Sequence, residues 1–269
     1  MKRCSLLLAA ALTLAACGAP AATSTTAASE GSTTSTTVAP TSSTTTGVTT
    51  TSTSSTSTST TAPTTSTTAP TTTTTVLAGE EIDFGPRAGD VLAVIGVRFD
   101  DVLNVRAGPG TDQPIVATLA PTSNEAVATG HTRALPRSFW TEVTVGGVTG
   151  WASLAYLGFL GVTSDITGDV VAALGGVPTA DTMEELGLVV AGTQASDEPR
   201  SDIVVVTAPT VGDVGEVVVD VVGLGDDALA GLRLRVVGGI PDSGDGFFLT
   251  LVEATALCAR GVTDDGLCL

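Results

Sequence analysis

The chain lacks several residue types on which many enzymes depend. Its 269 residues include one histidine, one lysine and nine aromatic residues. A lone histidine, His131, cannot supply the clustered ligands of a histidine-based metal site or the partners of a catalytic relay. The sequence also contains no Gly-x-Ser-x-Gly nucleophile motif and no Gly-Lys-Ser/Thr phosphate loop. We therefore expect no cofactor, no metal site and no catalytic residue.

Basic residues are scarce as well. The chain has 11 Lys and Arg against 28 Asp and Glu, a formal net charge of −17. Lys2 and Arg3 both lie in the first 16 residues, so without that segment nine arginines remain and the net charge is −19. Such a surface repels phosphate backbones and anionic lipid headgroups. We expect no nucleic-acid partner and no electrostatic binding to membranes.

Long hydrophobic runs are also missing. The run Leu6–Ala16 follows a basic start and is too short to span a bilayer permanently, but it has the length of a secretory signal. The second apolar stretch, Val217–Leu224, is shorter and is interrupted by Asp220. We expect residues 1–16 to be a cleaved signal peptide.

The signal ends in Leu14-Ala15-Ala16-Cys17, which resembles the lipobox of bacterial lipoproteins. The resemblance implies that Cys17 carries a thioether-linked diacylglycerol, and each buried methylene of an acyl chain adds about 0.8 kcal/mol of membrane affinity. The alternative is an ordinary signal peptide with a chance cysteine. We expect an extracytoplasmic protein, held on the outer face of the cell membrane by lipidated Cys17 alone.

Residues 17–78 form a low-complexity segment. Between Ala21 and Thr75, 40 of 55 residues are Ser or Thr. Such a segment cannot bury enough apolar surface to offset chain entropy, so we expect a disordered stalk. Its Thr-Ala-Pro repeats resemble O-glycosylated mucin-like stalks. A stalk of this length would lift the rest of the chain from the membrane towards the wall.

Residues 79–161 change to short strand-like runs at intervals of 8 to 12 residues, which favours a small barrel or sandwich. Within one run we expect Phe139, Val143 and Val145 to face the core, with Glu142 on the wet face. Gly146-Gly147 predicts a two-residue hairpin turn. The expected strands are Val91–Val97, Val102–Arg106, Ile115–Leu119, Ala126–Gly130, Phe139–Val145 and Val148–Ala152.

The same segment resembles the bacterial SH3-like domain family. Leu103–Gly110 matches the opening signature of that family, Gly150–Ala152 with Tyr156-Leu157 matches the closing one, and Trp140 lies where a tryptophan is usual. The resemblance implies a small SH3-like β-barrel of five to seven strands that targets proteins to the cell wall. It also implies peptidoglycan, or a peptide of the wall, as the partner.

Five residues of this module are candidates for ligand binding. Trp140, Trp151 and Tyr156 could form the walls of a groove for an extended peptide or glycan, because flat rings give contact area at low entropy cost. The alternative is that they fill the core and lid of the barrel. Asn104 and Arg106 could contact a ligand, or their side chains could fasten the adjacent Gly-Pro-Gly loop.

Residues 162–269 predict an α+β domain of two short helices and about four strands. The expected helices are Ile166–Leu174, capped by Asp165, and Thr182–Ala191, capped by Asp181 with Glu184. In an alternative arrangement, the helices connect the first module to an all-β sandwich. The expected strands are Ile203–Ala208, Glu216–Val222, Leu232–Val237 and Phe247–Ala256.

Cys258 and Cys268 are the other cysteines outside the signal segment, ten residues apart in a chain expected to be exported. We expect them to form a disulfide; a catalytic cysteine is the alternative, but this module has no histidine to activate it. Asp226-Asp227 and Asp242–Gly246 are expected to be solvated turns rather than calcium loops. The C-terminal segment resembles the tails of uncharacterised actinobacterial lipoproteins.

Together these features indicate a mostly β, non-catalytic envelope lipoprotein that binds the cell wall through its SH3-like domain. One alternative is a scaffold that binds a partner envelope protein, such as a transporter or wall synthase. A less favoured alternative is an accessory to a wall hydrolase.

Overall fold

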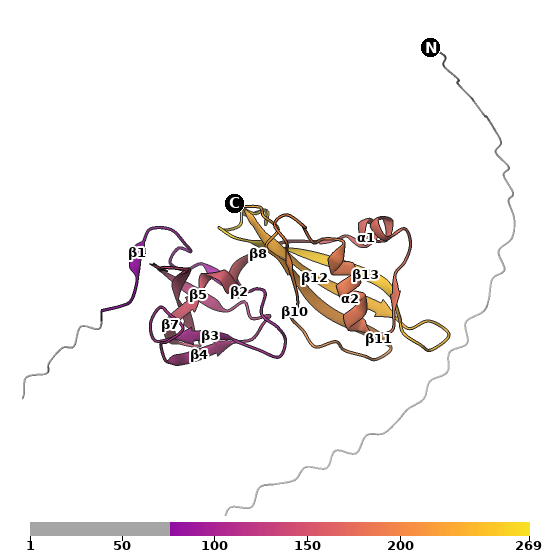
Figure 1. Cartoon of the computed structure of the whole chain (residues 1–269), viewed down its shortest axis with the longest axis horizontal. Coiled ribbons are helices and arrows are strands. Elements are labelled where there is room, and N and C mark those ends of the chain that lie inside the picture. The colour runs from indigo at the N-terminus through magenta and orange to yellow at the C-terminus, as the bar shows by residue number, and fades with distance from the viewer. Residues whose placement is uncertain (1–75) are drawn as a thin grey trace, which may run out of the picture. The chain divides into compact units, whose positions relative to one another are not determined.

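A computed structural model of the chain describes residues 76–269 (Figure 1). The expected signal peptide, Cys17 and nearly all of the expected stalk lie outside the described residues. The described residues belong to one compact unit. No helix in residues 76–269 combines the length and the apolar character that crossing a membrane requires.

The described residues are mostly β, as expected. The N-terminal strands are β1 (Glu80–Ile82), β2 (Val91–Val94), β3 (Leu103–Arg106), β4 (Ile115–Leu119), β5 (Ala126–Leu135), β6 (Ser138–Val145), β7 (Val148–Ser153) and β8 (Leu157–Asp165), with the 3₁₀ turn η1 (Leu154–Tyr156) before β8. The C-terminal elements are α1 (Thr167–Leu174), β9 (Thr179–Ala180), α2 (Met183–Gly192), β10 (Asp202–Val205), β11 (Val214–Val222), β12 (Leu229–Gly239) and β13 (Phe247–Cys258).

The strands β2 to β7 and the start of β8 wrap around one hydrophobic core. Leu92, Val105, Leu119, Val143 and Leu157, each from a different strand, are buried in it. Burial alternates along β3 and along β6 from Thr141 onwards, as a sheet with one covered face requires. The six predicted strands are present, and β5 extends five residues beyond its predicted end.

The tight turn between β6 and β7 forms as predicted. Val145 pairs with Val148, and the two intervening residues, Gly146 and Gly147, have φ angles of 56° and 83°. Positive φ at both central positions is the conformation that two-residue hairpins need and that glycine adopts without strain.

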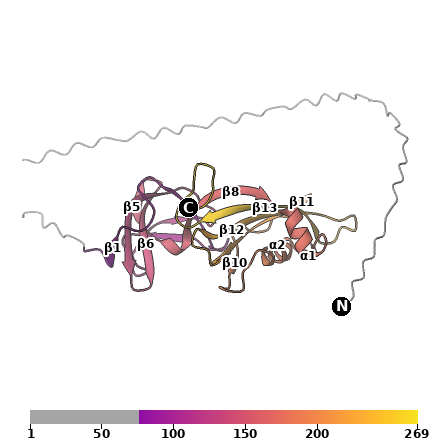
Figure 2. The same ribbon diagram turned by 90° about the horizontal axis from the view of Figure 1, so that it is seen from above.

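The C-terminal half is an antiparallel sheet in the order β10-β11-β12-β13-β8. Both helices lie against the same face of β11 to β13 (Figures 1 and 2). Val217, Val219 and Val221 point to this face and pack with Leu186 and Val190 of α2. The near-continuous β-branched sequence of β11 suits a strand that is covered on this side. The α+β layer is therefore present, and the sandwich alternative is not.

The cap of α2 lies one residue later than predicted. Thr182, not Asp181, is the N-cap: its hydroxyl accepts a hydrogen bond from the amide of Glu185 at 3.1 Å, and the Glu185 carboxylate accepts one from the Thr182 amide at 3.2 Å. This is a complete capping box. The capping-box pattern fits two overlapping pairs in the sequence equally well: Asp181 with Glu184, and Thr182 with Glu185. The sequence pattern alone therefore does not determine which residue is the N-cap.

We expect Thr182→Ala to lower the free energy of unfolding by about 1 kcal/mol, because it leaves the Glu185 amide without its acceptor. Urea denaturation followed by circular dichroism measures the change. Thr122→Ala removes an exposed threonine in the turn between β4 and β5, outside both helices, and serves as the control. Equal stabilities of the two variants would contradict the role of the cap.

The strand β8 links the two halves. It pairs with β2 through Gly158 and Leu157, and with β13 through residues 159–165. The expected module boundary at residues 161 and 162 falls inside this strand. The core of the N-terminal strands also includes Cys258, which is fully buried at the end of β13. The C-terminal half therefore contributes to the packing of the N-terminal core.

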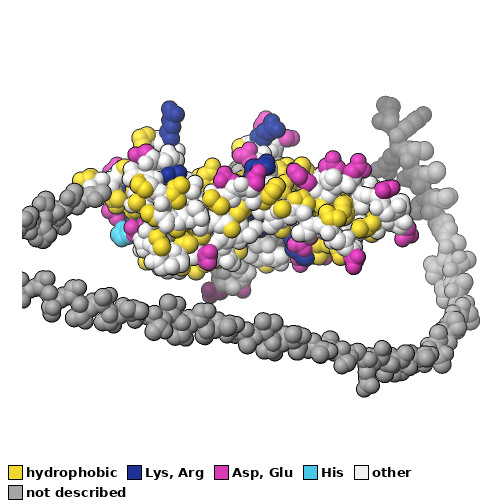
Figure 3. Space-filling view, turned by 90° about the horizontal axis from the view of Figure 1, so that it is seen from below, with side chains coloured by type: hydrophobic (Ala, Val, Ile, Leu, Met, Phe, Trp, Pro, Cys, Tyr) yellow, Lys and Arg dark blue, Asp and Glu magenta, His cyan; other side chains and the backbone are white. Residues whose placement is uncertain are grey.

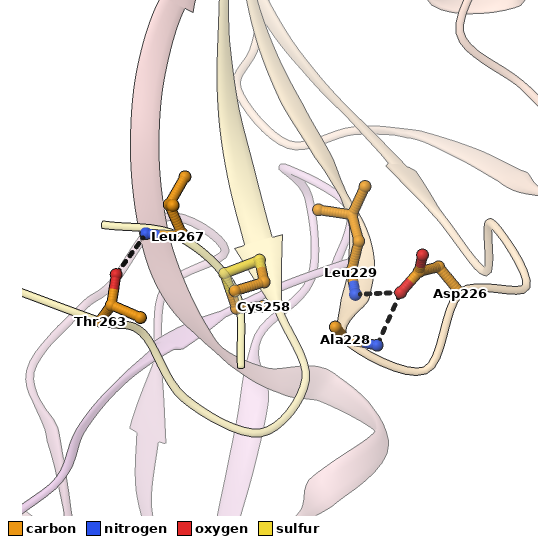
Figure 4. Close-up of a disulfide and its surroundings, with 7 residues drawn as sticks. Asp226, Ala228, Leu229, Cys258, Thr263 and Leu267 are labelled. Atoms are coloured by element: carbon orange, nitrogen blue, oxygen red, sulfur yellow. Dashed lines mark hydrogen bonds between the residues drawn. A yellow bond between two sulfur atoms is a disulfide. The ribbon is translucent and has the colours of Figure 1, made fainter. Parts of the chain in front are cut away.

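Cys258 and Cys268 form the predicted disulfide (Figure 4). The loop between them is closed a second time, because Thr263 Oγ1 accepts a hydrogen bond from the amide of Leu267 at 3.1 Å. Asp226 lies at a nearby turn, where its Oδ1 accepts hydrogen bonds from the amides of Ala228 at 2.7 Å and Leu229 at 2.9 Å.

These amides make the Asp226 turn sensitive to acid. The hydrogen bonds from Leu229 and Ala228 hold the pKa of Asp226 below its ordinary value of 3.8. The carboxylate therefore contributes stability that is complete above about pH 5 and is lost as the pH falls through the lower folded-state value. We expect the stability difference between the wild type and Asp226→Ala to shrink across this acid range. Urea midpoints measured from about pH 6 to about pH 2.5 test this, and a pH-independent difference would contradict it.

Candidate functional site

A groove of about 550 Å³ lies on the outer side of the N-terminal strands. Its walls come from the segment between β2 and β3, from the outer faces of β3, β6 and β7, from η1, and from one residue of β10. The lining residues are Gly96, Val97, Arg98, Asp101, Val102, Leu103, Asn104, Arg106, Thr111, Ser138, Trp140, Ser153, Tyr156 and Val204.

Strand alternation explains why these side chains meet. In β3, Leu103 and Val105 are buried, whereas Asn104 and Arg106 are partly exposed. Arg106 pairs with Trp151, and Trp140 pairs with Ser153 across β6 and β7. Residues paired directly opposite one another lie on the same face of a sheet. The outer face of β3, β6 and β7 therefore carries polar and aromatic side chains together.

The prediction for the start of β6 is wrong at Phe139. Its side chain is 48% exposed and packs edge-on against Phe84, with ring centroids 6.4 Å apart, while Trp140 is only 4% exposed. The expected alternation holds at Val143 and Val145. At the start of β6, however, the face that carries Phe139 lies beyond the core. Alternation along the strand therefore does not predict whether this side chain is buried.

Trp140 forms the buried floor of the groove. Its indole Nε1 donates a hydrogen bond to Ser138 Oγ at 3.0 Å. Truncating a buried tryptophan costs about 3–5 kcal/mol of stability, so an alanine at this position would disturb folding as well as the groove. Trp140 is thus buried on the outer face of the sheet, where it lines the groove, and it is not part of the core of the N-terminal strands.

Tyr156 and Trp151 differ in accessibility. Tyr156, in η1, is 46% exposed and lines the groove. Trp151 is 3% exposed and is not part of the lining. The structure thus brings together four of the five candidate residues, namely Asn104, Arg106, Trp140 and Tyr156, and places Trp151 beneath the neighbouring surface.

Arg106 also fastens the loop between β3 and β4. Its Nη1 donates a hydrogen bond to the carbonyl oxygen of Gln113 at 2.7 Å. This is the loop-fastening role considered from the sequence, and it fixes the guanidinium at the groove margin. A guanidinium has five N–H donors, so one bond to the loop leaves donors for a ligand.

The charges at the groove are mixed. Arg98 binds Asp100 through two hydrogen bonds of 2.9 and 3.2 Å, and the bonds with Asp100 raise the pKa of Arg98 and lower that of Asp100. Both side chains are more than half exposed, so water weakens this pair. At the groove, the two arginines Arg98 and Arg106 are thus balanced by two carboxylates, Asp101 in the lining and Asp100 beside it. The face in Figure 3 shows acidic side chains at many points and basic ones at few.

The ionisable side chains of the lining are Arg98, Arg106, Asp101 and Tyr156. The lining contains no histidine or cysteine and only one carboxylate, whereas nucleophilic and glycosidic mechanisms need a nucleophile with a base or a carboxylate pair. Residues 76–269 contain no cluster of three His, Cys, Asp or Glu side chains placed to hold a metal ion. His131 lies outside the groove, with Nδ1 2.9 Å from Glu81 Oε1.

Sequence reasoning missed several lining residues. Arg98 and Asp101 lie in the loop between β2 and β3, where no pattern marks the side that faces a groove. Ser138 and Ser153 are short polar residues at strand ends. Val204 lies about 50 residues beyond the nearest other lining residue, so only the tertiary fold reveals it.

Comparisons with known proteins find a similarity in one part of the chain. No curated protein and no solved structure matches the chain. The family model of the bacterial SH3 domain matches residues 101–158, which include β3 to β7 and η1. Residues 101–158 of the chain are therefore similar to the bacterial SH3 domain.

Proposed function

We propose that this protein is a non-catalytic lipoprotein of the cell envelope that binds peptidoglycan, through its stem peptides, in the groove of the SH3 domain. The observation that carries the proposal is the groove itself, which combines an exposed tyrosine, a tryptophan floor and two arginines. Lipidated Cys17 and the Ser/Thr-rich stalk would hold this groove at the outer face of the membrane within reach of the wall.

The chemistry of the groove fits an extended peptide with free carboxylates. Tyr156 offers a flat ring for packing against the peptide backbone and small side chains. Asn104 offers both an amide donor and an acceptor for backbone groups. Arg106 offers guanidinium donors, which bind carboxylates in a planar, two-pronged geometry, whereas Arg98 is already paired with Asp100. Uncharged glycan alone would leave the guanidinium of Arg106 without a charged partner.

Tyr156→Ala tests the proposal at an exposed position. We expect the apparent Kd for purified peptidoglycan to rise about tenfold, because one aromatic contact contributes on the order of 1–3 kcal/mol at such surfaces. Phe139→Ala is a matched control: Phe139 is 48% exposed, against 46% for Tyr156, and it does not line the groove. Co-sedimentation of residues 18–269 with insoluble peptidoglycan at moderate salt measures both variants.

Three outcomes separate the proposals. Weakened sedimentation of Tyr156→Ala with an unchanged Phe139→Ala supports wall binding in the groove. Absence of wild-type sedimentation contradicts wall binding and leaves the scaffold alternative. Release of soluble fragments from the wall by the wild-type chain would contradict the non-catalytic assignment.

A further inference from the structure

The loop that forms one side of the groove is attached to the C-terminal sheet. This loop connects β2 to β3 and contributes Gly96, Val97, Arg98 and Asp101 to the lining. The amide of Phe99 donates a hydrogen bond to the carbonyl oxygen of Val205 at 3.0 Å. The loop therefore continues the hydrogen bonding of the edge strand β10 rather than lying free in solvent.

A buried ion pair fixes the start of the same loop. Asp220 of β11 is fully buried, and its carboxylate accepts two hydrogen bonds from the guanidinium of Arg233, at 2.7 and 2.8 Å. Asp220 Oδ2 also accepts a bond from the amide of Gly96 at 2.9 Å, and Arg233 Nη2 donates to the carbonyl oxygen of Val94 at 2.7 Å. Both members of the pair thus contact the backbone on either side of Ile95.

The edge strand also supplies a side chain to the groove. Val204 is half-buried on β10 and lies on the face opposite Val205, whose side chain enters the core beneath the helices. Alternation along the strand therefore directs Val204 away from that core. It is the one groove-lining residue that lies outside residues 96–156.

We propose that the peptide groove is a composite site, in which the C-terminal sheet provides Val204 as a direct apolar contact for the ligand. The ligand class is the carboxylate-bearing peptide of the proposed function, on which this inference rests. Val204 would pack against a methyl or methylene group of the peptide, while Tyr156 and Arg106 act at the SH3 side of the groove. Recognition of the wall then requires residues 162–269 as well as the SH3 domain.

Val204→Gln and Val204→Ala test the composite site in the chain of residues 18–269. We expect the apparent Kd for insoluble peptidoglycan to rise about tenfold for Val204→Gln and about threefold for Val204→Ala, because the first adds an unpaired polar group and the second removes two methyl contacts. Val237→Gln is the control, because Val237 is half-buried on β12 of the same sheet and does not line the groove. Circular dichroism checks the folding of each variant.

The outcomes distinguish this inference from the proposed function. Weaker binding by the Val204 variants, with Val237→Gln unchanged, supports the composite site. Unchanged binding by Val204→Ala and Val204→Gln, while Tyr156→Ala still weakens it, overturns the composite site and leaves the proposed function intact. If Val204→Gln does not fold, Val204→Ala alone decides, since the loss of two half-buried methyl groups is small enough to be tolerated. Wall binding that is insensitive to both Tyr156 and Val204 would overturn both proposals.

Discussion

Asp220→Asn is expected to lower the free energy of unfolding by about 3–5 kcal/mol, among the largest effects of any single substitution in the C-terminal sheet. The variant keeps the shape of the side chain but removes its charge. Arg233, which is 12% exposed, would then be a nearly buried cation without its counter-charge. The cost arises from this unpaired charge, because the charged carboxylate that accepts both arms of its guanidinium is gone.

The same substitution weakens the junction between the two halves of the chain. Asp220 accepts the Gly96 amide, and Arg233 donates to the Val94 carbonyl, so the pair is bonded to the backbone of the N-terminal strands on both sides. We therefore expect both halves to lose stability together rather than the sheet alone. Unfolding followed by tryptophan fluorescence, which reports only on Trp140 and Trp151, should shift by as much as unfolding followed by far-ultraviolet circular dichroism.

The control for Asp220→Asn is Asp227→Asn. Asp227 is 87% exposed and forms a 2.7 Å ion pair with Arg260 at the surface. Exposed pairs contribute about 0–1 kcal/mol, so this variant should unfold close to the wild-type midpoint. If Asp220→Asn and Asp227→Asn were equally stable in urea, the buried pair would not have the structural role assigned to it.

Loss of the Cys258–Cys268 disulfide is expected to cost about 2.5–3 kcal/mol. The bond closes a loop of 10 residues, and chain-entropy reasoning gives about this value for a loop of that length. Cys258 is fully buried among the N-terminal strands, so the bond also holds the C-terminal segment against their core. Cys268→Ala breaks the bond while leaving the buried Cys258 side chain in place.

Urea denaturation with and without a reducing agent measures this contribution. The oxidised wild type should be the most stable form, and reduction should bring it to the stability of Cys268→Ala. Cys268→Ala itself should not respond to the reducing agent. A wild type whose midpoint is unchanged by complete reduction would contradict the stabilising role of the bond.

The local elements of the fold could be predicted because they depend on short patterns. Two strands follow from such patterns: β3 from its alternation of buried and exposed residues, and β11 from its run of β-branched residues. The turn between β6 and β7 follows from its pair of glycines. The patterns fail where the environment changes within one element. Phe139 belongs to β6 by sequence but lies beyond the core, and β8 begins in one half and ends in the other.

The site was predictable to the extent that it lies within the SH3 signature. Asn104, Arg106, Trp140 and Tyr156 were identified because they belong to that signature, and all four line the groove. Asp220 was seen in the sequence only as an interruption of an apolar stretch, since its partners Arg233 and Gly96 are 13 and 124 residues away. No local pattern marks a pair at such separations, nor the contribution of Val204.

The central claim is that the groove shared by the SH3 domain and β10 binds peptides of the cell wall. It is tested most directly by nuclear magnetic resonance of residues 18–269, titrated with soluble muropeptides released from purified peptidoglycan. We predict saturable shifts of the Trp140 indole, the Asn104 side-chain amide and the Val204 methyl groups, with little change at Phe139. Absence of shifts at millimolar muropeptide, or shifts confined to residues outside the groove, would contradict the account.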